Sequence, residues 1–595
     1  MKLRTMMCIL AIAGGLTLPV FAQSNSEANS SGSMNSSSSA ASDAAKIADQ
    51  IKALEAKMAG QQEVIADQQE QLAALREQLR KLQQQAAAQE QQVSDGALAG
   101  TPHLENATLR MPSASTEGQP GESTTRSTGS PAPPQDEKES PLSFRIGGAE
   151  FTPGGFVDFT SIFRTTNTGN LGTNFFSIPF NNGLSGAAGR LSEEKFTAQN
   201  SRISAKMTDQ FGANDVTAYY EMDFLGNDAV NTNVTSNSHT FRLRLYFLDF
   251  KRGKWEFLGG QAWSWLTPNR NGLSPMPDDV FYTKDEDFNY QVGLTWTRAP
   301  QFRVVYHPNG HWAMGVALEN ADQFGGQGEV PFPIAFSATL ANQIDEANTS
   351  NAPILFPDVI PKIAYDTNMN GKHFHAEVAG LLSQFKVAVE PTTAAPSGFV
   401  THHATGGGVE AAINLELFKG FNVVANAFYS DGGGRYIFGM APDLVILPTN
   451  APGDTCGIVG TVTQSAEGCD VRIGLVHSAS GMGGFEWAVT PHTMLYGYYG
   501  GMYAQRNFAA DLTSTMAMQP FIGFGGPNSA TNNNRAISEP TLGWIQTFWK
   551  SPQYGALQLI TQASYVTRSP WFVGAGQPKN AHLTMGWVNL RYVLP

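Results

Sequence analysis

The sequence has little charge, few cysteines and no long apolar run beyond its first twenty-odd residues. Only 15% of its 595 residues are charged, against about 25% in a typical soluble protein, and the net charge is −13. This acidic balance argues against nucleic acid as a partner. Because an apolar helix of about 18 or more residues is missing from the mature part, we expect no transmembrane helix there.

Catalytic and metal-binding signatures are also missing. There is no Ser-His-Asp set and no zinc signature, and the glycine triplets at 406–408 and 432–434 follow no strand-to-helix pattern. His373 and His375 share one face of a predicted strand, but a third metal ligand is not visible. We therefore predict no enzyme, no cofactor and no metal site.

The N-terminus and the cysteines indicate export. Residues 1–22 have a positive start, an apolar run and a Val-Phe-Ala cleavage pattern, which is typical of a secretory signal peptide. Cys8 lies within it, so the mature chain keeps only Cys456 and Cys469. In an oxidising compartment we expect these two to form a disulfide that closes a loop.

Three segments precede the last domain. A Ser-rich tether is predicted over 23–46, and a Gly-, Ser- and Pro-rich linker over 94–143. Between them, 47–93 repeats apolar residues and some glutamines at 4-3 spacing, which predicts an α-helical coiled coil and hence an oligomer. The heptads do not choose between a dimer and a trimer.

From residue 144 to 595 the sequence reads as β-strands. In GGFVDFTSIFRT, Val157, Phe159 and Phe163 alternate with polar residues, as a strand with two different faces requires. We count sixteen such strands, seven short turns and eight mostly long loops, and read 289–306 as one strand with a bulge at Pro300. These features, with 10% aromatic residues and low charge, predict an all-β, antiparallel transmembrane barrel with both of its ends on the short-turn side.

The stretch FRLRLYFLDF shows what each face of such a barrel would contact. Strict alternation puts one set of residues toward lipid and the other toward the lumen. The predicted lipid-facing set is Phe241, Leu243, Leu245 and Phe247, and the predicted lumen-facing set is Arg242, Arg244 and Tyr246.

The order of several segments resembles the DcaP-like outer-membrane porins. NSRISAKMTD, VTAYYEMDF, FRLRLYFLDF and LGGQAWSWLTP are followed by RAPQFRVVY and VALEN, which covers Asn200 to Asn320. The resemblance implies a sixteen-stranded, trimeric porin with an N-terminal periplasmic coiled coil that passes small anionic solutes such as dicarboxylates. Met222 replaces a glycine of the family pattern, and the chain ends in Pro595 where such barrels commonly end in an aromatic residue.

Two sets of charged residues are the candidate site. A ring of fixed charge selects ions of opposite sign because narrow, low-dielectric walls focus its field. The predicted pore-lining basic residues are Arg164, Arg202, Lys206, Arg242 and Arg244. The predicted pore-constricting acidic loop, which the resemblance supports, carries Asp278, Asp279, Asp285, Glu286 and Asp287. The alternatives are arginines that pair with loop acids or lipopolysaccharide, and a solvated surface loop.

The function predicted from these patterns is passive diffusion of small hydrophilic, anionic solutes through a homotrimer. The expected surroundings are outer-membrane lipid and lipopolysaccharide, with the N-terminal region in the periplasm. A sugar-type porin is an alternative, since Tyr496, Tyr498 and Tyr499 could supply an aromatic track. A coiled-coil tether between the outer membrane and the cell wall is another.

Overall fold

The computed structural model describes residues 140–595 with gaps. The gaps are 170–174, 176–177, 181–186, 227–238, 282, 286–289, 323–331, 342, 345–351, 391–397, 438–440, 450–468, 515–519, 528–533, 574–575 and 577. The predicted signal peptide, tether and coiled coil, and nearly all of the linker, lie outside the described residues, so those assignments remain predictions.

Sixteen long strands form one antiparallel β-barrel in the described part of the chain. They are β2 (Ala149–Arg164), β4 (Arg202–Phe211), β5 (Asn214–Asp223), β6 (Arg242–Arg252), β7 (Trp255–Trp263), β8 (Arg298–Tyr306), β9 (Trp312–Glu319), β10 (Asp358–Met369), β11 (Lys372–Val389), β12 (Val400–Phe418), β13 (Phe421–Asp431), β16 (His477–Thr490), β17 (Thr493–Ala504), β20 (Asn534–Ser551), β21 (Gly555–Pro570) and β22 (Ala581–Val593). The predicted number of strands is confirmed, and each predicted strand corresponds to one of these.

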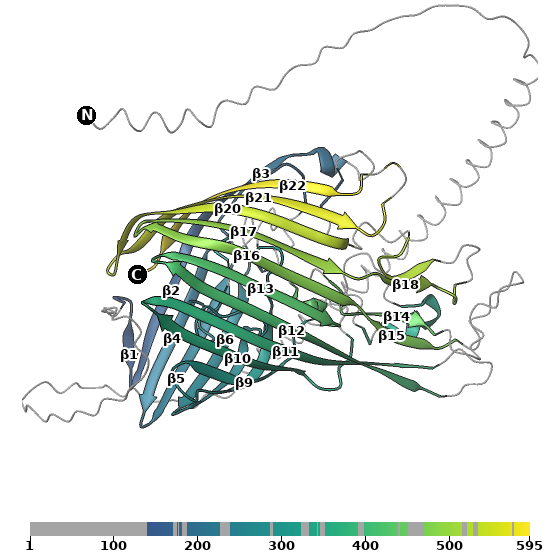
Figure 1. Cartoon of the computed structure of the whole chain (residues 1–595), viewed down its shortest axis with the longest axis horizontal. Helices are drawn as coiled ribbons and strands as arrows, with labels where there is room; N and C mark the ends of the chain where they lie inside the picture. The colour runs from purple at the N-terminus through teal and green to yellow at the C-terminus, as the bar shows by residue number, and fades with distance from the viewer. Residues whose placement is uncertain are drawn as a thin grey trace, which may run out of the picture. The chain divides into compact units, whose positions relative to one another are not determined.

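The first and last barrel strands pair with each other and close the barrel (Figure 1). Phe156 to Arg164 of β2 pair with β22, from Val593 back to Met585. On its other edge β2 pairs with β4 and with the short strand β3 (Glu193–Thr197), which extends the line of β4. A further short strand, β1 (Phe144–Ile146), pairs with the start of β2.

Polar and apolar side chains alternate between the inside and the outside of the barrel. Along β22, Trp587 and Asn589 are buried, whereas Val588 and Leu590 are 48% and 46% exposed. On β2 the same holds, with apolar side chains exposed and Asp158, Thr160 and Arg164 buried. An exterior of exposed apolar side chains around a polar interior is the pattern of a membrane barrel, the reverse of a soluble protein.

The short turns lie at one end of the barrel and the long loops at the other. The C-terminus lies at the short-turn end near β1 (Figure 1), where the Ser140 hydroxyl donates to the Pro595 carbonyl. The long-loop end carries the small sheets β14 (Leu444–Pro448) with β15 (Val471–Leu475) and β18 (Asn507–Ala510) with β19 (Phe521–Phe524). Its helical turns are η2 (Ala187–Arg190), η3 (Ile334–Phe336), α2 (Ser337–Leu340) and η4 (Gly434–Tyr436).

No helix among the described residues has the length and apolar character needed to cross a membrane.

A bulge in β6 corrects the face assignment made from strict alternation. Glu221 of β5 pairs with Leu245 and Met222 pairs with Leu243, so Arg244 is an extra residue on its strand. Beyond it the alternation reverses. Leu245 and Phe247 are buried inside, whereas Tyr246 is 42% exposed on the outside, opposite to the prediction for all three. An inserted residue changes the phase of a strand without interrupting its sequence pattern.

The prediction of one long strand over 289–306 is wrong in its first half. β8 begins only at Arg298, with Pro300 near its start, where a proline is tolerated. The preceding residues are apolar because they pack inside the barrel, and Val292, Leu294 and Trp296 are all buried.

Candidate functional site

The connection between β7 and β8, residues 264–297, lies inside the barrel and is called the inner loop below. Its described residues are 264–281, 283–285 and 290–297. Trp265 and Leu266 join the large cluster of buried apolar side chains, and Val280 and Phe281 join a second one with Tyr496 and residues of other strands. Apolar burial on this scale holds a long loop against the walls, where a solvated loop would expose these side chains.

One wall holds the start of the inner loop through a chain of charged groups. The Asn269 amide donates to the Glu377 carboxylate at 3.0 Å, and Lys362 lies 2.8 Å from the same carboxylate. His375 bridges Glu377 and Asp366, whose carboxylate also accepts the Gly272 amide at 3.0 Å. Each of these four charged side chains, on β10 and β11, contacts a group of opposite charge, as buried charges require.

The opposite walls hold the loop by three further contacts. Arg270 makes a bidentate ion pair with Glu486 of β16, at 2.7 and 2.9 Å. The Tyr498 hydroxyl of β17 donates to Glu486 and accepts the Lys284 amide. The Val292 amide donates to Glu539 of β20 at 3.0 Å. The inner loop therefore spans the interior from β10 and β11 to β16, β17 and β20.

The predicted acidic residues of this loop are not placed alike. Asp278 is exposed and Asp279 is half-buried, and burial raises the pKa of the Asp279 carboxyl. Asp285 lines a pocket with Arg202 and Lys284. The pKa of Lys284 is lowered, first by the charge of Arg270 and then by burial. Glu286 and Asp287 lie outside the described residues.

Arg242 and Arg244 lie on β6 against two carboxylates of the neighbouring strand β5. Arg242 makes a bidentate contact with Asp223 at 2.6 and 3.0 Å, and its side chain is 31% exposed. Arg244 is buried and bonds Glu221 at 2.6 Å and Asp223 at 3.0 Å. The two arginines are therefore neutralised in part, which strand alternation alone does not predict.

Two more arginines add to this group, which we call the arginine cluster: Arg202, Arg242, Arg244 and Arg298. Arg202 lies 3.7 Å from Glu221. Arg298 and Arg244 both lie over the Trp263 ring, at 5.6 and 5.7 Å from its centroid. Among the described residues Arg298 has no ion pair or hydrogen-bond partner, and its Nη1 is buried without an acceptor. Among the described residues, Glu221 and Asp223 are the carboxylates that contact these arginines.

The other two predicted basic residues lie apart from the arginine cluster. Arg164 is fully buried near the long-loop end, where it pairs with Glu193 at 3.3 Å and donates to Thr168. Lys206 is exposed near the short-turn end, on the same strand face as Arg202. The five predicted residues therefore do not form one continuous ladder.

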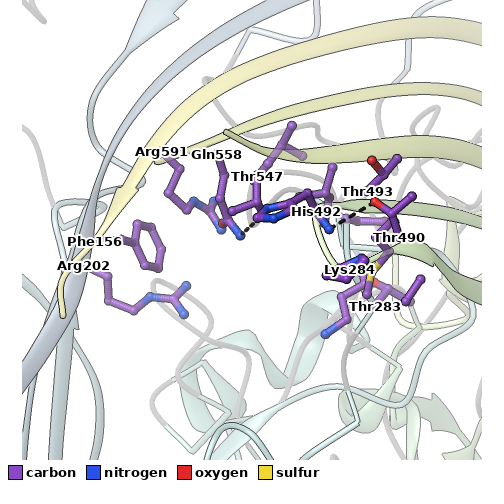
Figure 2. Close-up of a pocket in the computed structure, with 16 residues that line it drawn as sticks. Phe156, Arg202, Thr283, Lys284, Thr490, His492, Thr493, Thr547, Gln558 and Arg591 are labelled. Atoms are coloured by element: carbon purple, nitrogen blue, oxygen red, sulfur yellow. Dashed lines mark hydrogen bonds between the residues drawn. The ribbon is translucent and has the colours of Figure 1, made fainter. Parts of the chain in front are cut away.

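A cavity of about 370 Å³ lies inside the barrel at the short-turn end, and Arg202 of the arginine cluster is one of the residues that line it. Figure 2 shows Arg202, Phe156 and Arg591 on one side of it, His492 on another, and Lys284 reaching in from the inner loop. The guanidinium groups of Arg591 and Arg202 lie 4.1 and 5.0 Å from the centroid of the Phe156 ring. Arg591 also bonds the buried Asp158 at 2.7 Å. Among the described residues, Arg202, Lys284 and Arg591 line this pocket together with the carboxylate of Asp285.

Sequence reasoning missed three of these cations. Asn589 and Arg591 alternate with apolar residues near the end of the last strand, and this pattern could have identified Arg591 as a lumen-facing residue. Arg298 was hidden because the residues before it were read as strand. Lys284 is adjacent in sequence to the acidic residues of its own loop, and the prediction for this loop considered only the acidic residues.

Other predicted features are placed as follows. Cys469 is disulfide-bonded, but Cys456 lies outside the described residues, so the predicted pairing remains a prediction. Tyr496 and Tyr498 are buried under the inner loop, and Tyr499 is 64% exposed on the outside, so the three do not form one track. His375 is bonded to two carboxylates, and no group of residues suited to a metal is found in the described part of the chain.

Matches to known proteins are found among solved structures. No family model and no curated protein matches the sequence. Among solved structures, the outer-membrane channel DcaP of Acinetobacter baumannii matches at 15% identity and a TM-score of 0.49, over 75% of this chain and 97% of that one. The anion-selective porin from Comamonas acidovorans matches at 11% identity and 0.40, over 75% and 99%. OprB of Pseudomonas putida matches at 10% and 0.37, over 74% and 94%. The described part of the chain is a closed sixteen-stranded barrel, and the first two of these solved structures are described as an outer-membrane channel and an anion-selective porin.

Proposed function

We propose that the protein is an outer-membrane porin through which small hydrophilic anions diffuse passively, with dicarboxylates as the solute class. The apolar exterior of the closed barrel suits lipid, and its polar interior suits water and ions. The inner loop narrows the interior, so that a solute passes close to the walls it leaves open.

The proposal rests on Arg298 beside the inner loop, which has no ion pair among the described residues and whose buried Nη1 has no acceptor there. Arg298 lies over the Trp263 ring together with Arg244, next to the ion pairs that Glu221 and Asp223 form. In a narrow passage between low-dielectric walls, such a positive charge attracts anions and repels cations. Lys284 and Arg202 line the neighbouring cavity.

A dicarboxylate suits this arrangement better than a neutral sugar. Guanidinium groups bind carboxylates through paired, charge-assisted hydrogen bonds. The aromatic track that a sugar porin needs is not supplied by Tyr496 and Tyr498, because both rings are buried, with exposures of 1% and 4%.

The proposal extends to the N-terminal part. We place the short-turn end, with both ends of the barrel, in the periplasm, and the coiled coil of 47–93 with it. A heptad helix leaves its apolar seam in water unless other copies cover it, and we propose a homotrimer embedded in outer-membrane lipid. Cross-linking of the full chain with and without residues 47–93 would test the oligomer independently of conduction.

Conductance in planar bilayers tests the function. The folded protein should open steady channels whose anion preference falls in Arg298→Ala, since that change removes a cation that has no partner carboxylate. Arg252→Ala is the matched control, because Arg252 is exposed at a short turn of the same barrel. A barrel that inserts but conducts no ions would support the tether instead, and an unchanged preference in Arg298→Ala would refute the role of the cluster.

A further inference from the structure

Two arginines converge on one tryptophan at the long-loop end of the barrel. Arg506 follows β17, Arg535 is the second residue of β20, and Trp571 follows β21. The guanidinium carbons lie 5.7 and 5.9 Å from the centroid of the Trp571 ring, so they are at most about 12 Å apart. Arg506 also lies 5.3 Å from the centroid of the Phe508 ring. Three elements thus bring two like charges together.

Neither arginine has a carboxylate to balance it. Both are exposed, and neither makes an ion pair or hydrogen bond with a described residue. The only acidic residue between 505 and 538 is Asp511, which is buried and bonded to the Ile334 amide and to Thr513. Between 561 and 580 the sequence has no acidic residue at all. Local acids therefore do not neutralise this pair.

The pair lies on the outer surface of the wall, not in the lumen. Trp571 contacts Tyr503 edge-on at 6.0 Å, and Tyr503 is 43% exposed on the outward face of β17. Tyr499 and Leu542, further along the same outer surface, are 64% and 65% exposed. The cations therefore stand where an apolar, aromatic exterior gives way to the loops.

We propose that Arg506 and Arg535, held over the Trp571 ring, bind a phosphate group on a lipid headgroup of the outer leaflet; the Trp571 indole N–H donates to the Ala504 carbonyl and takes no part in binding the phosphate. An arginine binds phosphate oxygens through two parallel hydrogen bonds. Tryptophan is common at the membrane boundary, because its ring can contact lipid on one side and polar groups on the other. The acyl chains of such a lipid would lie along the exposed apolar side chains of β17 and β20. The inference rests on the proposed function for one point, that the long loops face outward from the cell.

The experiment measures retention of a phosphorylated glycolipid by the full-length protein in detergent micelles, using native mass spectrometry. The same glycolipid without its phosphates is the second probe, and inorganic phosphate is the competitor. The variants are Arg506→Ala/Arg535→Ala and, as a matched control, Arg252→Ala at the opposite end of the barrel. Conductance is recorded on the same samples.

The wild-type protein should retain the phosphorylated lipid, and the double variant should retain it at least about tenfold less, because two charge-assisted contacts are lost. Arg252→Ala should behave as wild type, and all samples should conduct alike, since Arg506 and Arg535 lie outside the lumen. Equal retention by the double variant, or equal retention of the dephosphorylated lipid, would overturn the proposal. Displacement of the lipid by an equal concentration of inorganic phosphate would overturn the assignment to a headgroup. Loss of conductance in every sample would count against the proposed function alone.

Discussion

Arg270→Met should loosen the inner loop without disturbing the barrel around it. Arg270 is the loop's charged contact with β16, and its bidentate pair with Glu486 joins residues 216 positions apart. Methionine keeps an apolar side chain near the Phe281 ring and removes the guanidinium group with its charge and its two hydrogen bonds to Glu486. Glu486 then keeps the Tyr498 hydroxyl as a donor but loses its neighbouring guanidinium.

The magnitude follows from the burial of the pair. Side-chain exposure is 16% for Arg270 and 4% for Glu486, so this is a largely buried ion pair. Removing one partner from such a pair costs about 3–5 kcal/mol, because the other charge is left buried. We take the lower end, about 3 kcal/mol, since Arg270 keeps some contact with water and Glu486 keeps one donor. That free energy corresponds to roughly a hundredfold change in the population of the released loop.

Hydrogen exchange read residue by residue is the assay. The Arg270 amide donates to Asp279 and the Phe281 amide to Pro268 within the docked loop, so their protection reports its release. Both amides should exchange roughly a hundredfold faster in Arg270→Met, while amides of β12 and β21 stay unchanged. Adding Glu486→Gln should restore much of the protection, because the stranded charge is gone. Unchanged protection in Arg270→Met, or equally faster exchange throughout the barrel, would show that this ion pair does not hold the loop.

Three further predictions concern the walls. Lys362→Met should destabilise the barrel by about 3–5 kcal/mol in thermal unfolding, because Glu377 keeps a buried charge, whereas the exposed Lys372→Met should change little. Asp223→Asn should increase the anion preference in reversal-potential measurements, since the arginine cluster then faces one carboxylate fewer, and a shift toward cations would contradict the charge count. Gly500→Ala should raise conductance and open-channel noise. The added methyl carbon would lie 1.9 Å from the Val292 carbonyl oxygen and would push the inner loop away from β17. Channels with the conductance and noise of the wild type would show that the loop is not held there.

The alternation of polar and apolar residues along each strand predicts most of the fold. Period-two patterns place Val157 and Phe159 on the outside and Asp158 on the inside, and the structure agrees. Such patterns depend only on the sequence around each residue, so the two faces of a strand can be assigned without knowing which strands lie beside it. The bulge at Arg244 is the exception, because it exists only in the pairing of β5 with β6.

The candidate site was less accessible, because its charges act across strands. Nothing near Arg242 in the sequence shows that Asp223 lies against it, since 19 positions separate them. The apolar residues at 290–297 read as strand because a segment buried inside the lumen and a segment buried in a sheet have similar composition. The lone Arg298 became visible only once the inner loop had been placed.

The arginine cluster, with Arg298 beside the inner loop, should make the passage prefer anions. The most direct measurement is the reversal potential of the reconstituted full-length protein under a potassium chloride gradient, repeated with a potassium dicarboxylate. We expect a potential of the sign set by anion permeation in chloride, and a reduced chloride current when the dicarboxylate is added. A potential of the opposite sign, with chloride current indifferent to the dicarboxylate, would contradict it.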